Sequence, residues 1–264
     1  RQMMRARTGM MRLNYIFLTH LHADHILGIP GLLETMAFQG RVEPITIAGP
    51  IHTARLVECF NSVCYFSRNF EVIALELSPE DVVKMKGYQV RAIETRHSVP
   101  SLGYILEEDQ RLGRFDRDAA LSLGVPPGPL FGRLQHGHEV AVEGRVVQPQ
   151  QVMGPPRPGR KVVYTGDTRP CRSVEDASRG ADLLIHDSAL ASDMIEWAME
   201  TKHSTAKEAA ELARRAGVRH LILTHISSRY SEDSSQLLNE ARLIFEKTDV
   251  AEDLMSLEIR FKDE

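Results

Sequence analysis

A cluster of metal-ligand side chains directly after an apolar run is the feature that most limits how this chain can fold. The run Tyr15–Leu18 precedes His20, His22, Asp24 and His25, which place three imidazoles and a carboxylate within six residues. Neutral imidazole nitrogen and carboxylate oxygen are the usual ligands of a catalytic zinc ion. On an extended chain His20 and His22 point the same way, and the other two donors follow a turn later. The spacing predicts one loop shared by two neighbouring metals; the alternative is a surface histidine tract without a fixed metal.

The composition is that of an ordinary globular domain and argues against several classes of protein. The 264 residues are enough for a full core, with 42% hydrophobic and 26% charged residues. No apolar stretch approaches the roughly 18 residues of a membrane span and no secretory leader is visible, so no membrane is expected. A net charge of −4 argues against bulk electrostatic binding of nucleic acid but leaves a local basic patch open. The three cysteines Cys59, Cys64 and Cys171 form no CxxC pair and predict free thiols in the cytoplasm.

Short strands alternate with helical patterns along the chain. Strands are expected at Tyr15–Thr19, Ile45–Ala48, Val72–Leu75, Val90–Thr95, Lys161–Thr165, Asp182–His186, His220–Thr224 and Leu257–Phe261. Helices are expected at Ile26–Phe38, His52–Asn61, Thr205–Ala216 and Ser234–Phe245. The capping box formed by Thr205 and Glu208 marks the clearest helix start. This order predicts α/β layers rather than a helix bundle or a sandwich of sheets alone.

The region from residue 107 to 160 breaks this pattern. Two Pro/Gly knots, Gly124–Pro129 and Gly154–Gly159, bracket two weak strands at Val140–Val142 and Arg145–Val147. A compact core does not use so many residues on such material. We therefore expect a single domain over residues 1–264 with an inserted flexible arm over 107–160.

Three isolated donors follow predicted strands at a distance from the first cluster: His97, Asp167 and His225. The carboxyl ends of strands are where α/β sheets place their sites. A lone histidine at such a position is more often a cap or a hydrogen-bonding residue. Three donors beside a four-ligand cluster favour metal binding, because seven ligands fit two ions with one shared carboxylate and open positions for water.

Two further residues have the chemistry of a proton donor rather than of a ligand. His203 precedes the capped helix, and Asp187 ends another predicted strand. A carboxylate beside an imidazole fixes its tautomer and raises its pKa, which suits a general acid. The sequence alone is equally compatible with the two residues being unpaired. The remaining histidines are expected to be structural: His52, His136, His138, His186 and His220.

Assembled in this way, the chain resembles the metallo-β-lactamase superfamily and, within it, the ribonuclease Z family of tRNA 3′-processing endonucleases. The superfamily resemblance rests on the seven ligands. The narrower one rests on four stretches and a similar Gly/Pro-rich arm at Gly124–Leu134, by which bacterial-type members grip the tRNA elbow. The four stretches are Leu18–Leu33, Gly166–Arg169, His203–Thr205 and Thr224–Tyr230.

The resemblance implies a four-layer αββα sandwich and two zinc ions per subunit. His20, His22 and His97 would hold one ion, Asp24, His25 and His225 the other, and Asp167 would bridge them. Hydroxide attack on the phosphorus follows, with Asp24 as base and His203, oriented by Asp187, as acid. The products are a tRNA with a 3′ hydroxyl and a trailer with a 5′ phosphate.

Two departures from the family pattern stand out. The family opens with strands that carry a Gly-Thr-Gly loop and an Asp-Cys-Gly motif, and the chain lacks both, so we expect the first strands to be missing. Asp187 stands where relatives usually have glutamate, which predicts an altered reach toward His203.

The partners implied are a precursor tRNA and a second copy of the chain in a homodimer, with no nucleotide cofactor. The candidate phosphate contacts are Arg157, Arg160, Lys161, Arg169 and Arg229. Two alternatives remain: a two-metal hydrolase of small phosphodiesters or other esters on the same fold, and a non-catalytic metal-stabilised module that binds RNA. The seven ligands argue against the second alternative, because a structural zinc needs only four.

Overall fold

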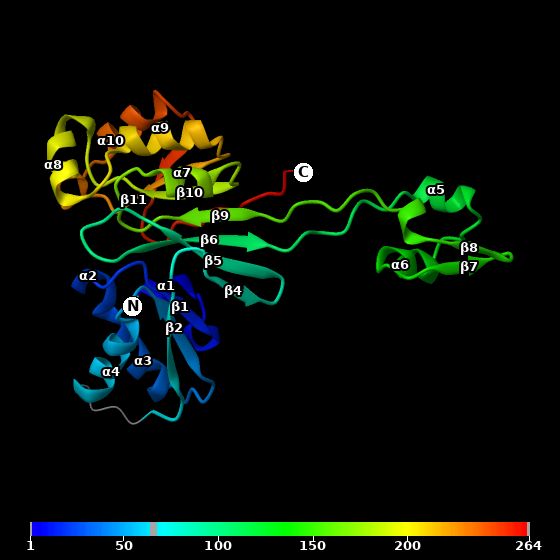
Figure 1. The fold of residues 1–264 in the computed structure, drawn as a ribbon, viewed down its shortest axis with the longest axis horizontal. Helices are drawn as coiled ribbons and strands as arrows, with labels where there is room; N and C mark the ends of the chain where they lie inside the picture. Colours follow the sequence, from blue (N-terminus) through cyan, green and yellow to red (C-terminus); the bar gives the residue numbers. More distant parts are fainter. Residues whose placement is uncertain (1, 64–67, 263–264) are drawn as a thin grey trace. The chain divides into compact units, whose positions relative to one another are not determined.

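The computed structural model describes residues 2–63 and 68–262, so Cys64 lies outside the described residues. The chain divides into two compact units (Figure 1). The first combines residues 1–107 with 160–264, and the second is Glu108–Gly159. The second unit has nearly the bounds at which the sequence places an inserted arm.

Two sheets form the first unit. The large sheet has the strand order β12-β11-β10-β9-β6-β5-β4, and the small sheet has the order β1-β2-β3. Strands β9 to β12 run parallel, β6 joins β9 antiparallel, and the small sheet is parallel throughout. The strands are β1 (Tyr15–Phe17), β2 (Ile45–Gly49), β3 (Val72–Glu76), β4 (Val82–Met85), β5 (Tyr88–Glu94), β6 (Leu102–Glu108), β9 (Lys161–Tyr164), β10 (Leu183–Asp187), β11 (Leu221–Thr224) and β12 (Thr248–Val250).

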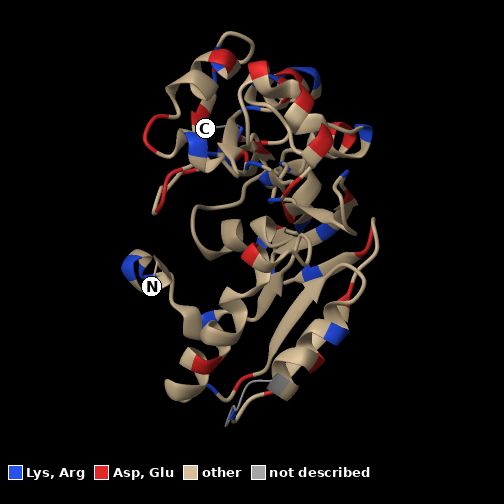
Figure 2. Ribbon diagram, turned by 90° about the vertical axis from the view of Figure 1, so that its left-hand side faces the viewer, with Lys and Arg blue, Asp and Glu red and all other residues tan. Residues whose placement is uncertain are grey.

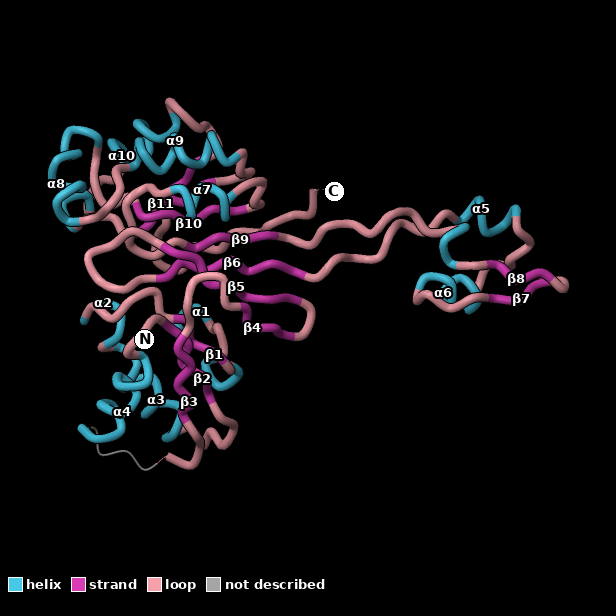
Figure 3. Tube along the Cα trace, viewed as in Figure 1, coloured by secondary structure: helices cyan, strands magenta, loops and turns pink. Residues whose placement is uncertain are grey.

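Helices cover the outer faces of both sheets. Figures 1 and 3 show α7, α9 and α10 over the large sheet, and α3 and α4 beside the small one. The helices of this unit are α1 (Gln2–Ala6), α2 (Ala23–Ile26), α3 (Gly28–Phe38), α4 (Thr53–Val63), α7 (Arg172–Ser178), α8 (Ile195–Thr201), α9 (Ala206–Ala216) and α10 (Ser235–Arg242).

Three buried clusters correspond to the three interfaces between these four layers. One joins the large sheet to α7, α9 and α10 around Leu184, Leu212 and Leu221. A second joins the small sheet to α3 and α4 around Leu33 and Ile47. The third lies between the two sheets and contains Ala48 and Tyr104 with their neighbours. Each fully buried Leu or Ile contributes about 1.5–3 kcal/mol to the free energy of folding. The αββα arrangement predicted from the sequence is confirmed.

The strand and helix predictions hold for most elements, and one is wrong. Residues Leu257–Phe261 do not form a strand. The carbonyls of Ile259 and Arg260 accept hydrogen bonds from the guanidinium groups of Arg160 and Arg219 (3.1 and 3.0 Å). The Phe261 ring packs under the Arg160 guanidinium at 4.5 Å. Arginine side chains therefore bond the backbone here in place of a neighbouring strand. Strands β4, β6 and β12 and helices α1, α2, α7 and α8 were not predicted.

The second unit is built around its own small core. It contains α5 (Arg117–Ser122), α6 (Pro129–Gln135) and a hairpin of β7 (Val140–Val142) and β8 (Arg145–Val147), the last two with the predicted bounds. The two helices were not predicted, although each has a start signal: Asp116 caps α5 and Pro129 opens α6. The core includes Ala120, Val125, Leu134, Val140, Val147 and Val152.

Charged side chains are spread over the surface with both signs interspersed. Figure 2 shows basic and acidic positions alternating along the helices that cover the large sheet.

Among the described residues, no helix is both long and apolar enough to cross a membrane.

Candidate metal centre and its acid–base pair

The loop that carries the first histidine cluster is anchored to both sheets. Leu18 donates its backbone N–H to the carbonyl of Ala48 (2.7 Å) in the small sheet and accepts the Tyr104 hydroxyl (2.5 Å) from the large one. The Thr19 carbonyl accepts the N–H of Leu102 (2.8 Å). His22 then forms the N-cap of α2, so the next two donors lie in a short helical turn that was not predicted from the sequence. The backbone hydrogen bonds fix where these imidazoles point.

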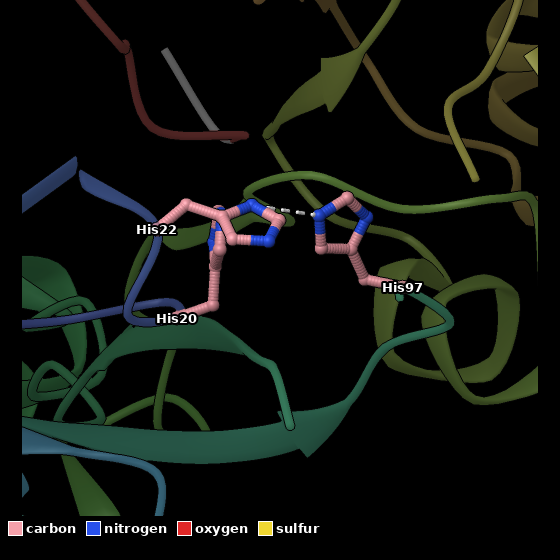
Figure 4. A group of neighbouring side chains, drawn as sticks. All are labelled: His20, His22 and His97. Atoms are coloured by element: carbon pink, nitrogen blue, oxygen red, sulfur yellow. Dashed lines mark hydrogen bonds between the residues drawn. The ribbon is translucent and has the colours of Figure 1, made fainter. Parts of the chain in front are cut away.

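Three imidazoles meet at the first candidate metal position (Figure 4). His20 Nε2 lies 3.0 Å from His22 Nδ1, and His97 Nε2 lies 3.4 Å from the same nitrogen. Tetrahedral zinc with Zn–N bonds of about 2.0–2.1 Å separates its ligand nitrogens by about 3.3–3.4 Å. His97 Nδ1 is 3.2 Å from the carbonyl of Lys202, so that nitrogen carries the proton and Nε2 offers its lone pair. The spacing and the donor set both suit a zinc ion.

A buried carboxylate oxygen links this group to a second one. Asp167 Oδ2 lies 3.7 Å from His20 Nε2, 3.4 Å from His25 Nε2 and 3.2 Å from His225 Nε2. Asp24 Oδ2 approaches His25 from the solvent side at 3.5 Å, with its side chain 73% exposed. The structure therefore brings together all seven residues that the sequence singles out, in overlapping groups that each suit one ion.

The charge state of two imidazoles also suits metal binding. Burial lowers the pKa of His20 to about 4, and the neighbouring His25 adds to this effect. Burial lowers the pKa of His97 as well. A metal binds the neutral imidazole, so these two side chains need not lose a proton at pH 7 before coordination.

His225 is held in an uncommon conformation. Its backbone φ is +58°, a left-handed value that a non-glycine residue adopts only when its surroundings enforce it. Its Nδ1 atom is buried and has no hydrogen-bond partner among the described residues. Strained backbone of this kind is concentrated at functional sites.

Asp187 and His203 form the expected pair. Asp187 Oδ2 lies 2.8 Å from His203 Nδ1, and the carboxylate also accepts the N–H groups of Thr168 (2.9 Å) and Ala189 (3.2 Å). Burial would lower the pKa of His203, but the hydrogen bond and charge of Asp187 outweigh it, so the pKa is raised. The shorter side chain at position 187 reaches the imidazole without loss of contact.

The sequence analysis gives Arg169 as a candidate contact to a substrate phosphate, but in the structure its side chain binds other protein groups. Its guanidinium binds the carboxylate of Glu208 and donates to the His203 carbonyl at 2.6 Å. Glu208 belongs to the predicted capping box of α9, which the structure confirms. Arg169 thus ties the Asp167 loop to the loop that carries His203. The pairing of Arg169 with Glu208 could not be predicted from the spacing of residues in the sequence.

The other candidate phosphate contacts differ in their surroundings. Arg160 donates to the carbonyl of Ile259, and Lys161 Nζ donates to the carbonyl of Arg179 at 3.2 Å. Arg157 belongs to the second unit, where its Nε donates to the Leu112 carbonyl at 3.0 Å. Arg229 alone is exposed beside the metal-type groups, on the loop that follows His225.

The histidines expected to be structural belong to no metal-type group in the described part of the chain.

Gly166 allows the Asp167 loop to lie against the first cluster. Its φ is +60°, and a Cβ atom there would lie 2.6 Å from Cγ2 of Thr19. We expect Gly166→Ala to cost about 2–4 kcal/mol of folding stability, through left-handed strain and overpacking together. Gly180 has nearly the same φ, +61°, but open space around it, so Gly180→Ala should cost about 1 kcal/mol. Thermal unfolding of both variants measures the difference; equal losses would show that the contact with Thr19 is unimportant.

The comparisons with known proteins agree with this geometry. A family model described as a β-lactamase superfamily domain matches residues 1–115 and 134–226. Ribonuclease Z of Methanosarcina acetivorans is 57% identical over the whole chain, which spans 86% of that protein, and ribonuclease Z of Archaeoglobus fulgidus is 47% identical with the same coverage. The crystal structure of the short form of human tRNase Z superposes with a TM-score of 0.67 at 24% identity, covering 98% of this chain and 84% of that one. The chain therefore belongs to the ribonuclease Z family of the metallo-β-lactamase superfamily.

Proposed function

We propose that this protein is a zinc-dependent endoribonuclease that removes the 3′ trailer from precursor tRNA, leaving a 3′ hydroxyl on the tRNA and a 5′ phosphate on the trailer. The observation that carries the proposal is full-length identity of 57% to a ribonuclease Z, in a chain whose donors and acid–base pair converge at one site. The alignment with that relative covers the whole chain and so includes both units.

The donor groups support two metal positions in each subunit. The proposed ligands of the first are His20, His22 and His97, those of the second are Asp24, His25 and His225, and Asp167 is shared. When bound, two zinc ions lower the pKa of a bound water toward 7 and stabilise charge on the phosphate oxygens.

The protein groups then have separate proton-transfer roles. Burial tends to raise the pKa of Asp24, but its own backbone N–H and the His25 imidazole outweigh burial and lower it, so the carboxylate is ionised. In the proposed reaction this carboxylate accepts the proton of the attacking water. His203 donates a proton to the departing 3′ oxygen. Asp187 holds the His203 ring with Nδ1 protonated, which leaves Nε2 as the atom that gives up the proton. Arg169, bound to the His203 carbonyl, holds the backbone of the same loop.

Incubation of the zinc-loaded protein with a precursor tRNA that lacks CCA tests the proposal. Mapping both ends at the cut should give a 3′ hydroxyl on the tRNA and a 5′ phosphate on the trailer. A cyclic phosphate product, or no cleavage of any precursor, would reject the proposed reaction.

Removal of the second unit distinguishes the proposed tRNA processing from the alternative function, hydrolysis of small phosphodiesters or other esters. Glu107 pairs with Lys161 in adjacent antiparallel strands, so two residues inserted in place of 108–159 form a three-residue turn with Arg160. If the unit binds tRNA, its loss should lower kcat/KM for precursor tRNA about 100-fold or more, because a second binding region raises affinity by about 10²–10⁴. Hydrolysis of bis(p-nitrophenyl) phosphate should persist. Unchanged tRNA processing would assign the unit another role.

The assembly and location follow the family expectation as part of the same proposal. We propose a homodimer in which the second unit of one subunit serves the metal centre of the other. The described cysteines are both free thiols, which supports a reducing compartment such as the cytoplasm.

A further inference from the structure

A pocket of about 350 Å³ opens beside the acid–base pair. Its wall includes His203 and His225 on one side and Leu190, Trp197, Ile226 and Arg229 on the others. This volume is within the range of about 300–1,000 Å³ that is usual for small-ligand sites. These apolar side chains have no role in the metal binding or proton transfer described above.

Hydrogen bonds fix the three segments that form the pocket. Helix α8 carries Trp197, and the carbonyl of Ala198 in the same helix accepts the N–H of His203 at 2.9 Å. The loop after β11 is tied to the segment after β10, because Ser227 donates its N–H to the carbonyl of Ala189 at 3.1 Å. The Tyr230 hydroxyl accepts the N–H of Ala191 at 3.2 Å. The pocket is therefore already formed when substrate arrives.

The chemistry of the wall fits a nucleotide. Trp197 is the single tryptophan of the chain; it is 45% exposed and lines this pocket. Exposed aromatic rings in single-stranded RNA sites stack on bases, and an arginine nearby supplies the charge that a phosphate needs. Arg229 provides that charge in the same pocket, and the hydroxyls of Ser227 and Ser228 provide donors.

We propose that Trp197 stacks on the base of the last nucleotide retained on the tRNA and sets a preference for a purine there. The assignment to this nucleotide rests on the proposed function: His203 protonates the 3′ oxygen of that nucleotide, and the pocket adjoins His203. Purines stack more strongly than pyrimidines because their ring surface is larger. A stacking contact with Trp197 therefore favours a purine at the last retained nucleotide.

Fluorescence of the wild-type protein reports directly on this contact, because Trp197 is its only source of indole emission. The zinc-loaded protein is titrated with a tRNA that ends in a 3′ hydroxyl at the last retained nucleotide, and with the same tRNA carrying an abasic residue there. We expect quenching with the intact RNA, little with the abasic one, and about 5- to 150-fold weaker binding of the latter. Equal quenching by both RNAs, or none by the intact RNA when filter retention shows binding, would overturn the proposal.

Kinetics of three variants give a second measurement. Trp197→Leu should raise KM for precursor tRNA about 5- to 150-fold and lose the purine preference, whereas Trp197→Phe should retain most of both. Met199 lies exposed on the same helix outside the pocket, so Met199→Ala serves as the matched control with unchanged KM. If the wild type cleaves precursor tRNA but Trp197→Leu keeps its KM and purine preference, the stacking role is wrong and the proposed function stands. If the wild type neither binds nor cleaves precursor tRNA, both fail together.

Discussion

Asp167→Ala is expected to lower kcat for precursor tRNA at least about 10³-fold and to reduce the bound zinc below two ions per subunit. The Asp167 carboxylate is 4% exposed, and one of its oxygens lies 3.2–3.7 Å from three imidazoles. Water is a weaker ligand than a carboxylate, so the substitution should weaken metal binding, and the loss of correctly held metal removes several kcal/mol of transition-state stabilisation. Metal content after gel filtration and steady-state kinetics measure the two effects.

Asp249 offers a matched control for the Asp167 substitution. It also contacts a histidine, His220, at 2.8 Å, but this pair belongs to none of the metal-type groups in the described residues. Asp249→Ala should retain both zinc ions and the wild-type kcat, with at most a small loss of stability. Two tightly bound zinc ions in Asp167→Ala would exclude a shared carboxylate at this position.

The donor residues could be found in the sequence because each one follows a strand that has its own local signal. His225 comes directly after β11, and His97 and Asp167 follow the ends of β5 and β9 by three residues. Strands β9, β10 and β11 are parallel, so their carboxyl ends lie at one edge of the sheet. The register of β10 against β11 pairs Asp187 with Thr224, one residue before His225. Short-range pattern and sheet geometry together were therefore sufficient to single out the candidate ligands.

Contacts made by long side chains could not be found in this way. Arg169 reaches Glu208 across 39 residues, and Arg160 reaches the Ile259 carbonyl across 99. Neither pairing follows from the period or composition of a segment, because the partners are chosen by the folded backbone. The same reason explains why Leu257–Phe261, with its alternating apolar residues, is not a strand: guanidinium groups satisfy its carbonyls.

The pH dependence of the enzyme should change when Asp187 is replaced by asparagine. The Asp187 carboxylate raises the pKa of His203 against the effect of burial, so the acid form of His203 persists to higher pH in the wild type. Without that charge, only the smaller effects of Asp167 and Asp24 oppose burial, so the pKa of His203 falls and the basic limb of the kcat profile should move to lower pH. The asparagine amide must also turn an N–H group toward the backbone N–H of Ala189 or Thr168, so kcat should fall about 10–100-fold at its optimum.

His203→Ala should lower kcat about 10²–10⁴-fold, the usual contribution of a general acid. The decisive comparison is with the double variant His203→Ala/Asp187→Ala. Asp187 acts on the reaction through the His203 ring, so removal of both side chains should cost no more in kcat than removal of His203 alone. An additional loss of tenfold or more in a double variant that still folds and binds zinc would mean that Asp187 also serves the reaction by another route. Its Oδ1 atom lies 3.9 Å from His225 Nδ1, so the zinc content of the double variant would show whether that route is the metal centre.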